Sequence, residues 1–351
     1  MSGIFVWGWT NRLREASGAA EKDSTFLTGL RAALDRPLLF FGGKGGVGKT
    51  TVAAARALQS AGEGTRTLLV STDPAHSTSD ALGVDLGPDP TEVVPALWAM
   101  ELDPSAEAER YMAGVKERIA EATPPRLAGE VERQIDVARA SPGAEEAALF
   151  DRFTRVIEEE PFPRIVFDTA PSGQTLRLLS LPELMTAWMG TLISQRKRVT
   201  ALGRMWRNVA GSAAGSAAQG RDPVLEALEE RRSRFERTRA VLRDPGKTAF
   251  LFVVVAEKLP VLETHRTMMA LAGHGIPVGG VIVNQVLPRS TTDPFLLLRK
   301  QREAALLADI EDRFGDWPVG YLPLLEQDPV GPDQLGRLLG RMRTNRTEAS
   351  T

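Results

Sequence analysis

A glycine-rich segment ending in a lysine and two threonines is the part of this sequence best suited to bind phosphate. It reads Gly-Gly-Lys-Gly-Gly-Val-Gly-Lys-Thr-Thr over residues 42–51, between an apolar run at 37–41 and a helical pattern at 52–60. Glycines let backbone N–H groups converge on phosphate oxygens, and a helix start adds partial positive charge. Lys49 should reach the β- and γ-phosphates, and the Thr50 hydroxyl should hold Mg²⁺. The predicted binding residues for ATP or ADP are Gly43, Lys44, Gly45, Gly46, Val47, Gly48, Lys49, Thr50 and Thr51.

A second lysine, Lys44, precedes the middle glycines of this loop. An ordinary phosphate loop does not need a lysine there, so the segment is a deviant Walker A loop. Lys44 is expected to point away from the γ-phosphate of its own chain, and it could serve a nucleotide across a dimer interface. The alternative is a solvated loop lysine.

Two aspartates follow apolar runs that we expect to be strands. Asp73 comes after the run at 67–71, and its carboxylate could orient a water in line with the γ-phosphate or could only cap the next helix. Asp168 ends the run at 164–168 and suits a Walker B role on hydrated Mg²⁺. The small residues after it, including Pro171 and Gly173, can present an N–H group to the γ-phosphate. We therefore predict Thr50, Asp73 and Asp168 as the magnesium-binding residues.

Short apolar runs alternate with helical patterns along the chain, which predicts an α/β fold with a doubly wound, mostly parallel sheet. We expect an N-terminal extension at 1–36, an ATPase domain at 37–340 and a polar tail at 341–351. Helical insertions at about 103–161 and 181–245 should form a subdomain. The predicted strands are 37–41, 67–71, 97–102, 164–168, 249–255, 280–284 and 319–322.

The composition excludes several classes of protein. The chain has 351 residues, 43 basic and 45 acidic side chains, three histidines and no cysteine. A nearly neutral balance gives no support for nucleic-acid binding, and the lack of cysteine excludes disulfides and thiolate zinc sites. No run approaches the roughly 20 apolar residues of a membrane span. We expect a cytoplasmic protein.

Three segments together resemble the family of arsenite-pump ATPases (ArsA) and guided-entry-of-tail-anchored-proteins ATPases. The first is the loop Gly43-Lys-Gly-Gly-Val-Gly-Lys-Thr-Thr51, and the second is Asp73-Pro-Ala-His76. The third is Asp168-Thr-Ala-Pro-Ser-Gly-Gln-Thr-Leu-Arg-Leu-Leu-Ser-Leu-Pro182, which follows the family pattern almost residue for residue. The resemblance covers about residues 38–339 and implies a P-loop ATPase that works as a homodimer.

The resemblance also implies roles for single residues. Lys44 would act across the homodimer, Asp73 would be the catalytic aspartate, and Glu257 and Asn284 would match nucleotide-binding positions, with Asn284 near the adenine. Arsenite regulation in this family uses cysteine thiolates, and its tail-anchor branch often clamps the dimer with a Cys-x-x-Cys zinc site. We therefore expect neither an arsenite site nor a zinc site in this cysteine-free chain.

The second insertion carries an apolar stripe that could contact a client. Leu181, Leu184, Met185, Trp188, Met189, Leu192 and Ile193 recur at helical spacing, and basic residues follow them. The stripe either lines a groove for a hydrophobic helix or is ordinary core.

The leading hypothesis is a Mg²⁺-dependent, nucleotide-switched homodimeric ATPase that handles hydrophobic helical clients. The alternatives are the motor subunit of an anion or metalloid efflux system, with a membrane-protein partner, and a nucleotide-gated scaffold with little turnover.

Overall fold

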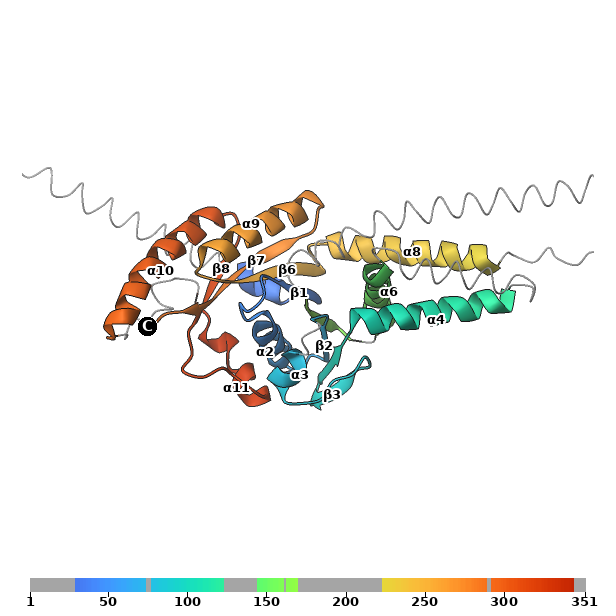
Figure 1. Cartoon of the computed structure of the whole chain (residues 1–351), viewed down its shortest axis with the longest axis horizontal. Helices are drawn as coiled ribbons and strands as arrows, with labels where there is room; N and C mark the ends of the chain where they lie inside the picture. Colours follow the sequence, from blue (N-terminus) through green and yellow to red (C-terminus); the bar gives the residue numbers. More distant parts are fainter. Residues whose placement is uncertain are drawn as a thin grey trace, which may run out of the picture. The chain divides into compact units, whose positions relative to one another are not determined.

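The computed structural model describes residues 29–73, 77–122, 144–160, 162–169, 223–288 and 292–343 (Figure 1). The chain divides into two compact units. The first comprises Met1–Glu101, Phe162–Thr175 and Arg243–Thr351, and the second comprises Leu102–Pro161 and Leu176–Leu242.

An eight-stranded sheet forms the centre of the first unit, in the order β3-β4-β2-β5-β1-β6-β7-β8. Every neighbouring pair is parallel except β3 and β4, which are antiparallel. The sheet is therefore mostly parallel, as predicted. The strands are β1 (Leu38–Gly42), β2 (Thr67–Ser71), β3 (Thr91–Val94), β4 (Leu97–Glu101), β5 (Arg164–Asp168), β6 (Thr248–Val255), β7 (Val278–Val286) and β8 (Val319–Pro323).

All seven predicted strands are present. The limits of β2 and β5 agree with the prediction, and the others differ at one or both ends, most of all at β7, which is longer than the predicted 280–284. The eighth strand, β3, was not predicted. It is a short edge strand with no fully buried residue, so it lacks the continuous apolar run of the buried strands.

Helices cover both faces of this sheet, which confirms the doubly wound fold (Figure 1). On one face, the alanine-rich helix α2 (Lys49–Gly62) packs in a single apolar core with residues 29–34, which are helical, and with α11 (Pro332–Gly336). The short helix α3 (Ser77–Leu82) contributes Leu82 to that core. On the other face lie α9 (Lys258–Gly273), which contacts β6 and β7, and α10 (Pro294–Arg313), which contacts α9. The 3-10 turn η2 (Leu339–Arg341) follows α11.

Aromatic stacking supports the strand order at the centre of the sheet. The Phe40 ring of β1 stacks between Phe167 of β5, at 4.7 Å, and Phe250 of β6, at 4.3 Å. The strand register places these three residues opposite one another. A cross-strand aromatic row of this kind stabilises the pairing of β1 with both neighbours.

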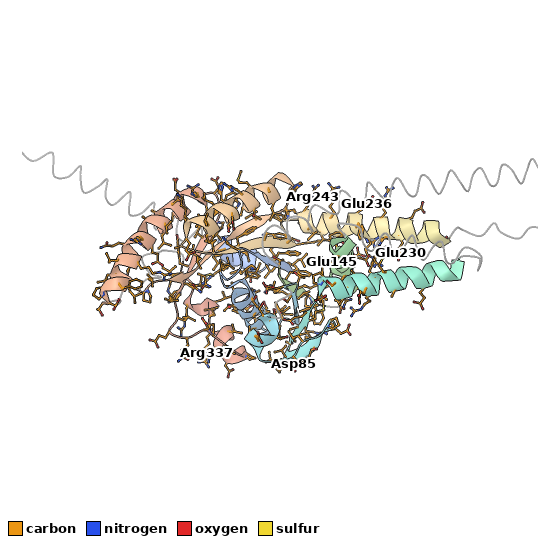
Figure 2. The ribbon with its side chains drawn as sticks, viewed as in Figure 1. Asp85, Glu145, Glu230, Glu236, Arg243 and Arg337 are labelled. Carbon is orange, nitrogen blue, oxygen red and sulfur yellow. The ribbon has the colours of Figure 1, made fainter. Side chains whose placement is uncertain are left out.

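Three helices of the second unit are described: α4 (Pro104–Ala122), α6 (Ala144–Glu159) and α8 (Pro223–Arg243). Phe150 of α6 packs edge-on against Phe235 of α8, at 5.1 Å. Next to them, Arg231 of α8 donates two hydrogen bonds to the buried Asp151 carboxylate and lies 4.5 Å from the Tyr111 ring of α4. Figure 2 labels three exposed acidic residues of α6 and α8, which are Glu145, Glu230 and Glu236. Hydrophobic and charged contacts thus hold α4, α6 and α8 together.

Part of the predicted N-terminal extension contributes to the core. Leu30, Ala33 and Leu34 are buried among residues of the sheet and α2. None of the helices that the structure describes is long and apolar enough to cross a membrane.

Candidate active site

The phosphate loop connects β1 to α2, with backbone geometry that glycine alone accommodates at two positions. Gly43 has φ +145°, and a Cβ atom there would lie 2.3 Å from the Val253 carbonyl oxygen. Gly48 has φ +92°, and its Cβ would lie 2.3 Å from the Nδ2 atom of Asn284. These close approaches explain why the loop between strand and helix is rich in glycine.

Lys49 is the first residue of α2 and is almost fully buried, with 4% of its surface exposed. Its Nζ atom donates a hydrogen bond to the Lys44 carbonyl oxygen at 3.2 Å. The ammonium group therefore lies against the backbone of the loop. A buried lysine with one backbone partner keeps two N–H donors for an anion.

A cluster of three side chains lies at the start of α2. The Thr50 hydroxyl donates to the Oδ2 atom of Asp168 at 2.6 Å, and the Ser77 hydroxyl lies 3.0 Å from the Thr50 oxygen. Because the single Thr50 proton is directed to the carboxylate, Ser77 is the donor in the second bond. The cluster joins residues from α2, β5 and α3, which meet because β5 lies between β1 and β2 in the sheet.

The carboxylate of Asp168 is placed to bind a cation. The residue is fully buried, and its Oδ1 atom has no hydrogen-bond partner among the described residues. Burial raises the pKa of Asp168 to about 7, and the carboxylates of Asp73 and Glu101 act in the same direction, while the Thr50 hydrogen bond and Lys49 oppose them. An unpaired carboxylate oxygen beside two hydroxyls is the set of hard oxygen donors that Mg²⁺ prefers.

Asp73 lies just past the end of β2 and is partly buried. Its N–H group donates to the Ser71 hydroxyl at 3.3 Å, and its carboxylate is near enough to raise the pKa of Asp168. Residues 74–76 lie outside the described part of the chain. In α3, which begins at Ser77, the N–H groups of Thr78 and Ser79 donate to the carboxylate of Glu101.

Lys44 is half-exposed and turns toward α9. Its Nζ atom lies 3.6 Å from the Oε2 atom of Glu263, and the two side chains are 40% and 48% exposed. Ion pairs this exposed contribute little to stability, about 0–1 kcal/mol. The Lys44 side chain can therefore leave Glu263 at small cost.

The two residues assigned to nucleotide binding by resemblance lie at the ends of adjacent strands. Asn284 of β7 donates from Nδ2 to the Val47 carbonyl oxygen at 3.0 Å, and so it supports the loop directly. Glu257 follows β6, is exposed, and makes no side-chain capping bond to α9 although it occupies the N-cap position. The predicted residues Pro171 and Gly173 lie outside the described residues.

Ser77 and Glu101 were not among the site residues predicted from the sequence. Ser77 is small and polar in a segment rich in such residues. Glu101 could have been found from the sequence, because it is a single carboxylate at the end of an otherwise apolar strand.

Comparison with known proteins decides the family. Residues 37–344 match the family described as the anion-transporting ATPases (ArsA). The chain belongs to this family. It is 35% identical over 301 residues to "Putative arsenical pump-driving ATPase 2" of Aquifex aeolicus, with 85% of this chain and 96% of the relative covered. It is 33% identical over 301 residues to "ATPase get3" of Schizosaccharomyces pombe, with 85% and 88% covered.

A third relative is longer. "Putative arsenical pump-driving ATPase" of Halobacterium salinarum is 34% identical over 305 residues, and the match covers 85% of this chain but 43% of the relative. Membership of the ArsA family confirms the resemblance on which the sequence analysis relied. This chain is therefore a nucleotide-binding ATPase with the P-loop fold.

Proposed function

We propose that this ArsA-family ATPase hydrolyses ATP with Mg²⁺ in a homodimer that closes on ATP and reopens after hydrolysis. The observation that carries the proposal is the 2.6 Å hydrogen bond between the Thr50 hydroxyl and the buried Asp168 carboxylate, beside the buried Lys49. In the proposed site Lys49 would bind the β- and γ-phosphates, and Thr50 and Asp168 would hold the hydrated Mg²⁺. The bound metal would supply charge neutralisation at the phosphates.

Asp73 is proposed to orient the attacking water. Its position past the carboxyl end of β2, within electrostatic range of Asp168, supports this role. Hydrolysis needs little covalent chemistry from the protein, because positioning and charge stabilisation supply most of the catalysis. The Asp73 carboxylate thus acts by holding a water in line with the γ-phosphate.

Two variants separate binding from hydrolysis. Lys49→Ala should abolish ATP binding, because the buried ammonium group on the phosphates is lost. Asp73→Asn should bind ATP normally and lose nearly all phosphate release. The matched control is Asp80→Asn, an exposed carboxylate on α3 that should leave both measurements unchanged. Normal phosphate release by Asp73→Asn would contradict the assignment, and a wild-type chain that binds ATP without turnover would favour the scaffold alternative.

Exposed apolar side chains support the homodimer. Of the seven large hydrophobic residues that the structure describes as exposed, six follow the carboxyl ends of β6, β7 or β8. The phosphate loop leaves the neighbouring strand β1 at the same edge of the sheet. Apolar residues gathered on one edge are typical of a surface that a partner covers. The six residues are Leu259, Phe295, Leu297, Leu298, Leu324 and Val330.

Phe295→Asp should weaken the ATP-bound dimer by about tenfold or more, because a charge would enter the proposed interface. Phe295 is 71% exposed, so the change should not affect folding. Met269→Asp is the matched control, since Met269 is also exposed but lies late in α9, away from the strand ends. Sedimentation of both variants with ATP measures the effect, and equal dimer stability in the two would argue against this edge as the interface.

Lys44 is proposed to act on the nucleotide of the partner copy. Lys44→Ala and Asp73→Asn should each be inactive alone. Mixed dimers should then regain activity, because one of their two sites combines the unchanged Asp73 of one copy with the unchanged Lys44 of the other. A mixture that stays inactive while subunit exchange is demonstrated would mean that Lys44 does not act in trans.

The proposed clients are hydrophobic helices, as the family resemblance implies. The stripe at 181–193 lies outside the described residues, so this part of the proposal depends on its sequence. Met185→Asp or Met189→Asp should keep ATPase activity and weaken capture of a model helix of about 20 apolar residues. Loss of folding in both variants would make the stripe ordinary core.

The alternative is the motor subunit of an efflux system, which the name of the Aquifex relative favours. Normal capture of the model helix by the folded variants would shift support to it. The absence of cysteine from the whole chain counts against an arsenite-thiolate site.

A further inference from the structure

The carboxylate of Glu101 is buried at the end of β4, with 5% of the residue exposed. Its Oε1 atom accepts hydrogen bonds from the N–H groups of Thr78 at 3.1 Å and Ser79 at 3.0 Å. Its Oε2 atom accepts from the Ser79 hydroxyl at 2.9 Å. Burying a carboxylate is costly unless hydrogen bonds satisfy it, and three donors from α3 do so here.

These bonds fix the first turn of α3 to the sheet. The Ser79 hydroxyl also accepts from the Leu86 N–H group at 3.2 Å, which ties the loop after α3 to the same point. Glu101 lies opposite Ser71 in the parallel pairing of β4 with β2, and Asp73 follows Ser71 by two residues. Glu101 therefore anchors the far end of the segment that begins at the proposed catalytic aspartate.

The same first turn of α3 reaches the proposed metal site. Ser77 precedes the two anchored residues, and its hydroxyl donates to Thr50, which in turn donates to Asp168. A shift of α3 would break the bond from Ser77 to Thr50, because Ser77 is the member of this cluster that lies on α3. Hydrogen-bonded side chains of this kind hold one another in place.

We propose that Glu101 is a positioning residue for ATP hydrolysis, acting through α3 to keep the Ser77 hydroxyl on Thr50. The inference rests on the proposed role of Thr50 and Asp168 in holding Mg²⁺. Glu101 accepts its three described hydrogen bonds from α3, so the effect that it exerts through α3 should fall on turnover rather than on ATP binding.

Glu101→Ala tests the proposal by steady-state ATPase kinetics at varied ATP and Mg²⁺. The kcat should fall about tenfold while KM for ATP changes less than about threefold, and half-saturation should need more Mg²⁺. Glu101→Gln should recover most of the kcat, because its amide oxygen still accepts from the two N–H groups. Ser79→Ala, which removes one of the three bonds, should give an intermediate kcat.

Asp103→Ala is the matched control. Asp103 lies two residues further along and accepts one N–H bond, from Ala106 at 2.7 Å, at the start of α4. Its loss removes a helix cap of similar kind without touching α3. The control should lower thermal stability slightly and leave kcat and the Mg²⁺ requirement unchanged.

A double-mutant cycle shows whether Glu101 acts through Ser77. In a Ser77→Ala background, Glu101→Ala should change kcat by less than about twofold. The same tenfold loss in both backgrounds would overturn the proposal, as would a variant that loses thermal stability but keeps kcat. If Glu101→Ala does not fold, Ser79→Ala decides: a kcat equal to wild type overturns the proposal. Phosphate release by the wild type and by Asp73→Asn is measured in parallel. If the wild type releases phosphate and Asp73→Asn does not, the proposed ATPase site holds even where the proposal for Glu101 fails.

Discussion

Replacing Gly48 by alanine tests how the phosphate loop is fitted against Asn284. A non-glycine residue in the left-handed region costs about 1–2 kcal/mol, and Gly48 has φ +92°. The new methyl group would also lie 2.3 Å from the Asn284 Nδ2 atom. Asn284 would have to move and lose its bond to Val47, at a cost of about 1 kcal/mol. We expect Gly48→Ala to lower the free energy of unfolding by about 2–3 kcal/mol in total.

The pair of changes should be less than additive. Asn284→Ala alone should cost about 1 kcal/mol, for the lost bond to Val47. The double variant should cost no more than Gly48→Ala, because the bond is already broken there. The coupling is then about 1 kcal/mol. It can be measured without nucleotide by urea unfolding followed by circular dichroism.

Gly46→Ala is the control for this cycle. Gly46 has φ +80°, but a Cβ atom there would meet nothing within 4 Å. Its cost should come from the backbone alone and should add to that of Asn284→Ala. An additive result for Gly48 as well would refute the idea that Asn284 and Gly48 compete for the same space.

Two further changes test the two units separately. Asp151→Ala should lower the free energy of unfolding of the second unit by about 3–5 kcal/mol, because the change leaves Arg231 without its carboxylate partner. Urea unfolding measures this loss, with Glu230→Ala at an exposed position as the control. A loss no larger than that of the control would contradict the prediction. Burial raises the pKa of Glu303, so the folded state holds its proton more tightly than the unfolded state, and this contribution to stability falls as pH rises from the ordinary glutamate pKa through the raised value. Glu303→Gln should remove that part of the pH dependence without lowering thermal stability at pH 7, and a variant with the wild-type pH profile would refute it.

The positions of the strands along the chain were predicted well from the sequence, but their order in the sheet was not predicted. Continuous apolar runs marked the buried strands because both faces of a parallel sheet are covered. Nothing local indicated that β5 lies between β1 and β2, since this order arises from packing of segments far apart in the chain. The edge strand β3 was missed because its residues are partly exposed and carry no run of apolar side chains.

The candidate site was predictable where local sequence motifs mark its residues, and not where distant segments meet. Thr50, Asp73 and Asp168 were assigned to one metal from their motifs, and the structure places Thr50 and Asp168 in contact across 118 residues of sequence. The link through Ser77 to Glu101 required the position of α3, which no motif gives. Asn284 was predicted near the base, whereas the described contact of its amide is with the phosphate loop.

The position of β1 in the sheet has a consequence for synthesis of the chain. Its two neighbours are β5 and β6, which begin at Arg164 and Thr248, so β1 has no strand partner when it leaves the ribosome. The phosphate loop that follows it can reach its final shape only after β5 has been translated, together with the helices α4 and α6 that come before it. Contacts so distant in sequence form slowly, and unpaired apolar strands are prone to aggregate in the meantime. Nascent chains that end before Asp168 should therefore depend on chaperones, although most of the nucleotide-binding motif has already been made.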